Sequence, residues 1–531
     1  MYAATNKGIV TLKPDKIELF SEANGLPNNI VSSLCQDHEE NLWAAMERGG
    51  LGKFSRGKFL DLTSAQSLPA AAANAVLEDA DKNIWIAKDD DVVCLKSSFL
   101  LPERSTRIDA LIAALQNVRV RQIREEEDGT LFFATYSDKG LVVFSQDGQI
   151  RFITKKDGLP NNRVRFSYRS SNGLLWIGTT AGPAVYYNGK ITVFTQDDGL
   201  PNLFMLCAQE GQDGSLWFGT DGGGAVELSV DGLTAGMLKI KTEHIYTKAE
   251  GLSGNVVFRI VQDPEGLWFC TGQGLTLYKN GTFYPADKAL GFSKAGVFNI
   301  IRDKTDNLWI VTAKELLLSK REHLTQAVLA NEPAGNLIRY NRLDGLTGQL
   351  AANAWAYLSE KNTLFIPTLK GVAVCDPTYY IANKHTPPVV IETIFLDGKK
   401  LDTPLTAFTV HADTKRILFK FTALSFTIPQ RVQFEYQLEG YDTEWKSCGS
   451  SREIAYTNLN PGNYVFRVRA ANNDGFLNKE GAAAAFYKKP FFYQTVWFYL
   501  VIAVCIGGTV FFTVQLRFKV LQRRADELDK K

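Results

Sequence analysis

The sequence predicts an all-β protein: a β-propeller of about seven blades with partial extra blades, then an immunoglobulin- or fibronectin-like β-sandwich and one transmembrane helix. Three observations predict it. An aromatic strand recurs at steps of 41 to 56 residues, a segment of about 100 residues then alternates apolar and polar residues, and an uncharged stretch of 20 residues follows. The chain has 531 residues, 45% of them hydrophobic, and a formal net charge of +2, which is ordinary globular composition and gives no electrostatic case for a nucleic-acid partner.

The recurring element is a short strand of the type Leu-Trp-Ile-Gly-Thr. Its aromatic positions are Tyr2, Trp43, Trp85, Phe132, Trp176, Trp217, Trp268, Trp309 and Phe365. A period of 40 to 50 residues with one aromatic strand per unit is typical of propeller blades, each a four-stranded sheet. We expect each aromatic side chain to pack against the neighbouring blade.

A Gly-Leu-Pro turn precedes many of these strands at a constant distance. Trp43, Trp85, Trp176 and Trp217 each follow a proline by 16 residues. Proline fixes φ near −65°, glycine tolerates positive φ, and asparagine bonds its own backbone, so the motif suits a tight turn. The constant spacing indicates that the first two strands of a blade keep the same length from one blade to the next.

Nine aromatic units are too many for one common ring. We therefore expect residues 1–80 to be partial blades, the remnant of a preceding propeller, and residues 81–384 to be a seven-bladed β-propeller; a single irregular ring is the alternative. Because the chain starts inside a unit, with "MYAATNKG", we expect the natural N-terminus to be missing.

Residues 385–490 follow a Pro-Pro linker and predict the sandwich. The strands "FEYQLEG" and "NYVFRVRAAN" alternate strictly, as a half-buried antiparallel sheet does, and "NLNPGNY" is the turn into the second of them. Several short strands with turn signals in about 100 residues are typical of an immunoglobulin-like domain.

Residues 495–514 are 20 residues without a charge, long enough to cross a hydrocarbon core of roughly 30 Å as a helix. Residues 515–531 hold six basic residues, whereas 478–494 hold three. By the positive-inside rule the tail is cytoplasmic, and we expect a single-pass protein of the bacterial inner membrane with residues 1–494 in the periplasm. A sparse stripe of apolar residues in the basic tail predicts a helical stalk that pairs with a second copy.

Two motif sets resemble a known family. The repeats resemble two-component regulator propeller repeats. A second set resembles the triple-tyrosine (Y_Y_Y) domain and comprises Tyr436, Leu438, Gly440, Tyr441, Trp445, Tyr456, Leu459, Pro461, Gly462, Tyr464, Arg469 and Ala470. Their order resembles the periplasmic sensor region of hybrid histidine kinase-type receptors, truncated at both ends.

That resemblance implies a function. The propeller would bind a ligand, and the sandwich and the membrane helix of a homodimer would relay the signal to an output domain that is missing here, a histidine kinase or, second, a diguanylate cyclase. The expected partners are a small polar or oligosaccharide ligand and the inner membrane, with no nucleic acid.

No catalytic motif stands out. The five histidines form no H-E-x-x-H pattern, the seven cysteines lack zinc-ligand spacing, and no G-x-S-x-G is present. We therefore predict no catalytic residue, no metal and no cofactor, and no enzyme activity for this chain. The aspartates of the turns (157, 197, 198 and 344) suit turn capping better than catalysis. The alternatives are a membrane-tethered propeller enzyme, a polysaccharide lyase or hydrolase, and an adhesion scaffold.

A ligand site is predicted where the innermost strands begin, near the central channel. Amide, guanidinium and aromatic groups there suit a sugar or another polar ligand. The candidate residues are Asn29, Asn162, Arg163, Arg165, Asn202, Phe204, Asn255 and Phe258.

Overall fold

The computed structural model describes residues 1–13, 16–22, 26–54, 57–65, 69–96, 101–102, 105–234, 237–292, 294–335, 337–346, 348–377, 383–402 and 406–528. The chain forms two compact units. One runs from Arg56 to Tyr380, and the other combines Met1–Ser55 with Ile381–Lys531.

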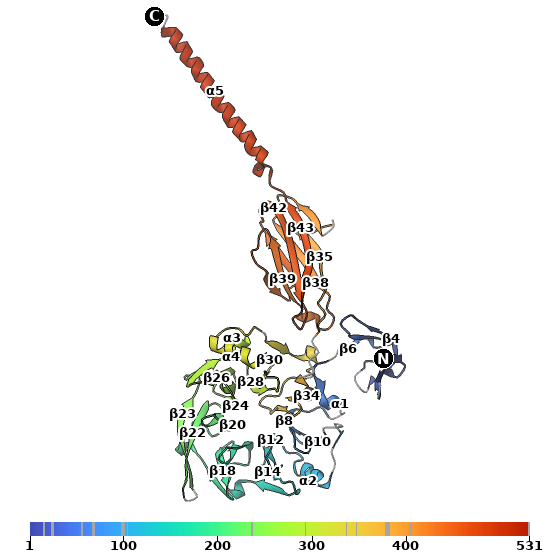
Figure 1. The fold of residues 1–531 in the computed structure, drawn as a ribbon, viewed down its shortest axis with the longest axis vertical. Coiled ribbons are helices and arrows are strands. Elements are labelled where there is room, and N and C mark those ends of the chain that lie inside the picture. Colours follow the sequence, from blue (N-terminus) through green and yellow to red (C-terminus); the bar gives the residue numbers. More distant parts are fainter. Residues whose placement is uncertain are drawn as a thin grey trace. The chain divides into compact units, whose positions relative to one another are not determined.

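The unit Arg56–Tyr380 contains seven four-stranded antiparallel sheets (Figure 1). In six of them the strands follow one another along the chain, as in propeller blades. Their strands are β8 (Ala73–Glu78), β9 (Asn83–Lys88), β10 (Val92–Lys96) and β11 (Leu101–Pro102); β12 (Val120–Glu125), β13 (Leu131–Thr135), β14 (Leu141–Phe144) and β15 (Ile150–Ile153); β16 (Val164–Arg169), β17 (Leu175–Thr179), β18 (Gly182–Tyr187) and β19 (Lys190–Val193); β20 (Met205–Glu210), β21 (Leu216–Thr220), β22 (Ala225–Thr234) and β23 (Met237–Tyr246); β24 (Val257–Asp263), β25 (Gly266–Thr271), β26 (Gly274–Lys279) and β27 (Thr282–Pro285); and β28 (Val297–Arg302), β29 (Asn307–Thr312), β30 (Leu316–Lys320) and β31 (Ile338–Tyr340).

The seventh blade is built from both ends of this unit. β32 (Tyr357–Leu358), β33 (Leu364–Thr368) and β34 (Gly371–Cys375) supply its inner strands. Its outer strand is β7 (Leu60–Asp61), which precedes the first blade in the chain and pairs antiparallel with β34. The N-terminal end of the unit therefore closes the last blade, which ties the ring together.

Seven apolar clusters lie between successive blades. Each joins side chains of one blade to those of the next, and the last joins the seventh blade to the first through residues such as Phe365 and Ile86. β33 also contacts β8. The ring is therefore closed and is held by burial between blades, since each blade alone exposes two apolar faces.

The aromatic strands pack as predicted. Trp176 and Trp217 lie in the clusters with the following blade, and both are buried. The indole N–H of Trp85 donates to Asp79 Oδ2 at 2.7 Å, and that of Trp309 donates to Asp303 Oδ2 at 2.8 Å. The polar turn before the aromatic strand thus supplies the acceptor that a buried indole requires.

Short helices connect the strands of this unit. They are α1 (Leu62–Ala65), α2 (Thr106–Ala114), α3 (Asp287–Leu290), α4 (Arg321–Ala330) and the 3₁₀ turns η2 (Lys155–Asp157), η3 (Gln196–Asp198) and η4 (Arg342–Asp344). The three 3₁₀ turns start the Gly-Leu motif, and each is closed by a capping box and by a glycine in the left-handed region, such as Gly158 at φ 111°. Asp157, Asp198 and Asp344 therefore cap turns, in line with the interpretation preferred from the sequence.

The second unit begins with two three-stranded sheets. They are β1 (Tyr2–Thr5), β2 (Gly8–Lys13) and β3 (Lys16–Phe20), and β4 (Val31–Gln36), β5 (Leu42–Met46) and β6 (Gly50–Phe54). A small core of five buried residues, among them Ile9 and Met46, joins the two sheets. β4 and β5 repeat the blade pattern, and the Trp43 indole donates to Asp37 Oδ2 at 2.8 Å. They are the partial blades that the repeat predicts.

The same unit contains a β-sandwich. One sheet has the order β36 (Lys399–Lys400), β35 (Val389–Leu396), β38 (Arg416–Ala423), β41 (Glu453–Thr457). The other has the order β37 (Ala407–Val410), β43 (Leu477–Lys488), β42 (Gly462–Ala471), β39 (Gln433–Glu439), β40 (Lys446–Gly449). Burial alternates strictly along β38 and β42, and Phe419 stacks on Phe466 between the sheets with ring centroids 4.0 Å apart.

Two tyrosines of the triple-tyrosine motif bond inside the sandwich. The Tyr464 hydroxyl donates to the carbonyl of Asn460 at 2.9 Å, the geometry of a tyrosine corner. The Tyr456 hydroxyl donates to Asp442 Oδ2 at 2.5 Å, and Lys446 Nζ lies 2.6 Å from Asp442 Oδ1. Burial opposes ionisation of Asp442, but these bonds prevail and hold its pKa below the ordinary value.

The short turn η6 (Pro429–Arg431) lies between β38 and β39, and the turn η7 (Phe492–Gln494) follows the sandwich. The chain then forms one long helix, α5 (Val496–Leu528). Within it, Val496–Ala525 is long and apolar enough to cross a membrane by length and composition, and none of that apolar stretch is buried. The predicted fold class is confirmed in its three parts. The exact domain limits drawn from the sequence stay predictions, as does the pairing of the helical stalk.

Candidate ligand site on the propeller axis

The innermost strands of six blades share a local irregularity at their second residue. The ladder register shifts there, so that one residue bulges out of the pairing. The bulged residues are Asn74, Arg121, Arg165, Leu206, Phe258 and Phe298. A β-bulge changes the direction of a side chain and is frequent beside functional sites. These six positions are therefore candidates for a binding site.

Three arginines gather around one tyrosine. The guanidinium carbons of Arg121, Arg163 and Arg165 lie 5.5, 5.2 and 5.8 Å from the centroid of the Tyr136 ring. Arg165 also lies 5.6 Å from the Phe204 ring centroid. These residues come from three consecutive blades, and the contacts are cation–π contacts, which retain positive charge at the site.

A fourth arginine is stacked on a tryptophan. The Arg259 guanidinium carbon lies 3.2 Å from the centroid of Trp355, and its Nη2 donates to the carbonyl of Ala354 at 3.2 Å. Arg259 is 3% exposed. The Trp355 side chain packs against the cluster between the first two blades and against that between the third and fourth blades. Its backbone N–H donates to the carbonyl of Asn74 at 2.8 Å. Because these two clusters lie in different sectors of the ring, a side chain that contacts both must lie near the ring axis.

The charges of these arginines act on one another. Burial first, and then the charge of Arg165, lower the pKa of Arg259 to about 10. Burial first, and then the charges of Arg165 and Arg119, lower the pKa of Arg121 to about 10. With pKa values of about 10, Arg121 and Arg259 remain protonated at neutral pH. The arginines near the axis come from the second, third and fifth blades.

The side chains of the four predicted asparagines make hydrogen bonds to the backbone. Asn29, Asn162 and Asn255 each accept, through Oδ1, an N–H from the residue seven positions earlier. Asn202 accepts the N–H of Phe204 at 2.7 Å and donates to the carbonyl of Asp221 at 2.8 Å. These bonds use part of the hydrogen-bonding capacity of each amide, and a ligand role for the four residues stays a prediction.

Among the other predicted residues, Arg163, Arg165 and Phe204 share the tyrosine cluster just described. Phe258 is half-buried and packs edge-to-face on Phe298 with ring centroids 5.4 Å apart. Asn29 belongs to the other compact unit. A ligand role for these residues also stays a prediction.

Sequence reasoning missed Arg121, Tyr136, Arg259 and Trp355. Arg121 begins a blade that has no Gly-Leu-Pro turn, and Arg259 lies one residue beyond the predicted Phe258. Trp355 precedes a strand of only two residues. The available signal was the pattern of arginines at the starts of innermost strands, "VRVRQI" and "RVRFSY".

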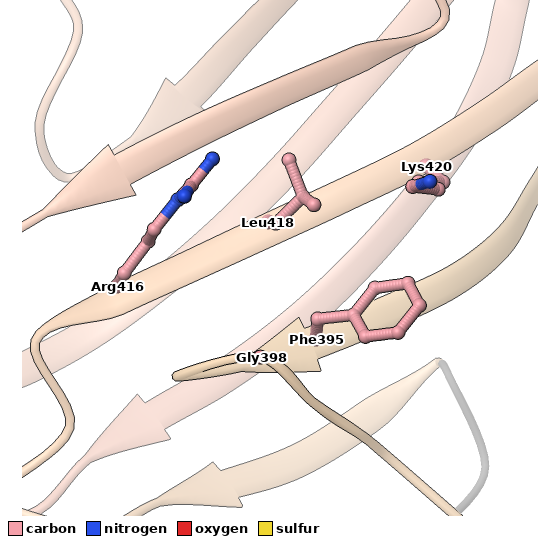
Figure 2. A pocket seen from close by; sticks show the side chains of 5 residues that line it. All are labelled: Phe395, Gly398, Arg416, Leu418 and Lys420. Carbon is pink, nitrogen blue, oxygen red and sulfur yellow. The ribbon is translucent and has the colours of Figure 1, made fainter.

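Two hollows in the described surface lie away from the arginine cluster. One on the sandwich, with a volume of about 170 Å³, is lined by Phe395, Gly398, Arg416, Leu418 and Lys420 (Figure 2). It is below the roughly 300 Å³ of an ordinary small-molecule site. Another, of about 390 Å³, lies at the outer turns of the third and fourth blades around Trp176 and Glu210. Neither contains the arginine cluster, and we rank the cluster higher because its charge is buried and only partly compensated.

A second arrangement joins the partial blades to the sandwich inside one compact unit. Glu39, which is 8% exposed, accepts hydrogen bonds from the backbone N–H groups of Phe426 and Thr427 at 2.6 and 2.7 Å. It also accepts from the hydroxyls of Ser425 and Thr427 and from the Asn383 amide. Burial alone would raise the pKa of Glu39, but these donors lower it below its ordinary value. We call this the Glu39 junction.

Lys53 strengthens the Glu39 junction. Its Nζ donates to the carbonyls of Phe426 and Thr427 at 2.6 and 2.8 Å, and the Trp43 ring packs edge-to-face on Phe426. A buried carboxylate with five donors fixes the geometry of both segments, because removal of the acceptor would leave those donors unpaired.

In the described part of the chain no group of three or more His, Cys, Asp or Glu side chains could hold a metal ion. The architecture that the structure defines is thus a closed seven-bladed ring, partial blades joined to a β-sandwich, and one long apolar helix. This is a receptor-like class of chain, with a folded region on one side of a potential membrane span.

The comparisons with known proteins agree with this class. Residues 425–487 match the Y_Y_Y domain, and residues 25–48 and 158–181 match the two component regulator propeller. The resemblance stated from the sequence is therefore confirmed: the chain contains both kinds of module.

Two relatives extend that result. The chain is 24% identical over 521 residues to histidine kinase P4 of Formosa agariphila, covering 92% of this chain and 33% of that protein. Its fold is similar to an extracellular domain assigned to the hybrid two component system BT3049 of B. thetaiotaomicron, with a TM-score of 0.73, 19% identity, and coverage of 92% of this chain and 66% of that one. The chain thus spans about a third of the curated relative it matches.

Proposed function

We propose that this chain is the extracytoplasmic ligand-sensing region of a membrane-bound signal-transduction receptor. The seven-bladed ring binds a small polar or oligosaccharide ligand at its axis, and the sandwich and α5 relay the signal inward. The observation that carries the proposal is the combination, in one chain, of a partly uncompensated arginine–aromatic cluster on a closed ring with a Y_Y_Y sandwich and a single apolar helix.

The relay requires two arrangements of the receptor. A ligand shifts an equilibrium only by its different affinity for the two states, so we infer a homodimer whose sandwiches and helices take up two relative positions. The Glu39 junction supports this mechanism, because its hydrogen bonds join the partial blades directly to the sandwich loop 425–427. We infer that the output domain is a histidine kinase and that it lies at the cytoplasmic face of the bacterial inner membrane.

A chimera tests the proposal. The chain is fused after Lys531 to the catalytic core of a histidine kinase with a known reporter, and cells are exposed to a panel of polysaccharide hydrolysates. We expect at least one hydrolysate to change reporter output severalfold. A correctly inserted chimera whose output no hydrolysate changes would argue against ligand sensing.

The gene itself separates the sensor from a tethered scaffold. We expect a kinase domain in frame after Lys531, and a stop codon directly after it would favour the adhesion scaffold. The tethered-enzyme alternative is tested by incubating the purified chain with the same polysaccharides and measuring new reducing ends or unsaturated products. If the purified chain cleaves a polysaccharide in this assay, its primary role is catalysis and not sensing.

A further inference from the structure

The positive charge on the propeller axis is only partly balanced. The carboxylates of the described residues that act on Arg121 and Arg165 are Asp89 and Asp221. Asp89 is already engaged by Arg119, whose Nε lies 2.7 Å from Asp89 Oδ1. Guanidinium groups outnumber carboxylates at this position, and like charges held together cost free energy unless an anion joins them.

Several buried guanidinium nitrogens also lack hydrogen-bond acceptors. Within the residues that the structure describes, Nε and Nη1 of Arg259 and Nε of Arg121 have no partner. Arg259 uses one of five N–H donors, on the carbonyl of Ala354. Because a buried polar donor without a partner is costly, a fold that retains three such nitrogens near one axis points to an acceptor supplied from outside.

The surroundings of these nitrogens indicate which acceptor fits. A guanidinium is a planar fork that pairs with carboxylate, sulfate or phosphate oxygens. The rings of Tyr136, Phe204 and Trp355 stand beside the arginines and offer flat apolar faces. A ligand that meets both features carries an oxyanion on a ring-shaped polar body.

We propose that the propeller axis binds an acidic saccharide, through its carboxylate or sulfate group, with Arg121, Arg163, Arg165 and Arg259 as the anion-binding residues. This inference rests on the proposed sensing function and adds the chemical class of the ligand. Arg163, which is exposed, meets the anion first, the buried Arg165 holds it, and Arg259 stacked on Trp355 forms the floor.

Binding measurements on the full chain in lipid nanodiscs test the proposal. The probes are three tetrasaccharides: tetragalacturonate, which carries carboxylates; a chondroitin sulfate tetrasaccharide, which carries both groups; and neutral maltotetraose. We expect at least one acidic probe to bind and to raise the unfolding temperature, with an affinity at least tenfold above that for maltotetraose and falling with added salt.

Three variants locate the site. Arg163→Gln and Arg165→Gln should each lower the affinity for the acidic probe about tenfold or more, the usual effect of losing one charge-assisted contact. Arg151→Gln is the matched control, because Arg151 also lies over a tyrosine ring, Tyr186 at 5.5 Å, but on the outer strand of the second blade. Since Arg163 is exposed, its variant keeps the test valid if a buried arginine proves necessary for folding.

The outcomes separate this inference from the function on which it rests. Tight binding of maltotetraose that Arg165→Gln leaves unchanged would overturn the anionic class and leave ligand sensing in place. Absence of binding by all three probes would also overturn the acidic-saccharide proposal, while the kinase chimera tests sensing by itself. Binding of the sulfated probe alone, or of tetragalacturonate alone, supports the proposal and identifies the oxyanion.

Discussion

At the scale of single residues, Glu39 is a centre of dense hydrogen bonding outside the propeller. One carboxylate accepts from two backbone amides, two hydroxyls and one side-chain amide. Charge-assisted bonds of this kind are each worth roughly 1.5–3 kcal/mol. The local stability of the loop 425–427 should therefore depend on this one side chain.

Replacing Glu39 by alanine should expose that dependence. We expect the amide hydrogens of Phe426 and Thr427 to exchange with solvent about tenfold faster or more, because both lose their acceptor. Hydrogen exchange followed by mass spectrometry measures this. Glu47→Ala, at an exposed position of the same segment, serves as the control. Unchanged exchange at residues 426 and 427 in the Glu39 variant would contradict the Glu39 junction.

Acid should weaken both compact units. Asp303, Asp442 and Glu39 are buried, which by itself raises a carboxyl pKa, but hydrogen bonds lower the pKa of all three below the ordinary value. The unfolded chain then binds protons more readily than the folded one. Their stabilisation is complete above the unfolded pKa, about 4, and is lost as pH falls through the lower folded pKa.

Thermal unfolding between pH 3 and pH 7 measures this acid effect. We expect the unfolding temperature to fall steeply below about pH 4 and the fall to be shallower in Asp303→Asn, which removes one of the titrating groups. Asp197→Asn, at an exposed turn position, is the matched control. An unfolding temperature that rises towards pH 3 would contradict the assigned pKa directions.

Part of the candidate site follows from the sequence, for a physical reason. Residues after a Gly-Leu-Pro turn start an innermost strand, and that rule found Arg165 and Phe204, which the structure brings within 5.6 Å of each other, guanidinium carbon to ring centroid. It could not find Arg121, whose blade lacks the turn. It also did not identify which N–H groups Asn162 and Asn255 cap, because each of these groups lies seven residues earlier in a turn whose path the sequence does not reveal.

At the scale of elements, the blade is the unit that the sequence predicts best. The constant spacing from proline to tryptophan corresponds to two paired strands, and the tryptophans bury themselves between blades. The closing strand β7 was not predicted from the sequence. It has only two residues, and its partner β34 lies about 310 residues further along the chain, so no local pattern marks it.

The closure of the ring should be sensitive to α1, which follows β7. Leu62 is fully buried in the cluster between the seventh and first blades. Leu62→Ala should destabilise the unit Arg56–Tyr380 by about 2–5 kcal/mol, the usual cost of removing a buried leucine. Leu369→Ala, at a position that is 48% exposed in the seventh blade, should cost less than about 0.5 kcal/mol.

Denaturant unfolding followed by tryptophan fluorescence compares these two variants. Because most of the tryptophans lie between blades, loss of closure should appear as one earlier transition of the whole ring. Equal stability of the two variants would mean that the N-terminal end does not hold the ring closed.

At the scale of the whole molecule, the sequence predicted the order of the modules better than their limits. The sandwich and the long helix follow from strict alternation and from an uncharged stretch, two patterns that depend on local periodicity alone. The division into units does not follow from such patterns. Residues 1–55 share a compact unit with the sandwich, which depends on contacts such as those of Glu39 across 386 to 388 residues.

The central claim is that the ring and the sandwich lie outside the cytoplasm and that α5 alone connects them with the cell interior. Fusions of alkaline phosphatase and of green fluorescent protein after Lys489 and after Lys531 test it most directly. A single crossing predicts active phosphatase with no fluorescence at Lys489, and inactive phosphatase with bright fluorescence at Lys531. Active phosphatase at both positions, or fluorescence at both, would contradict a single membrane crossing between them and with it the sensor.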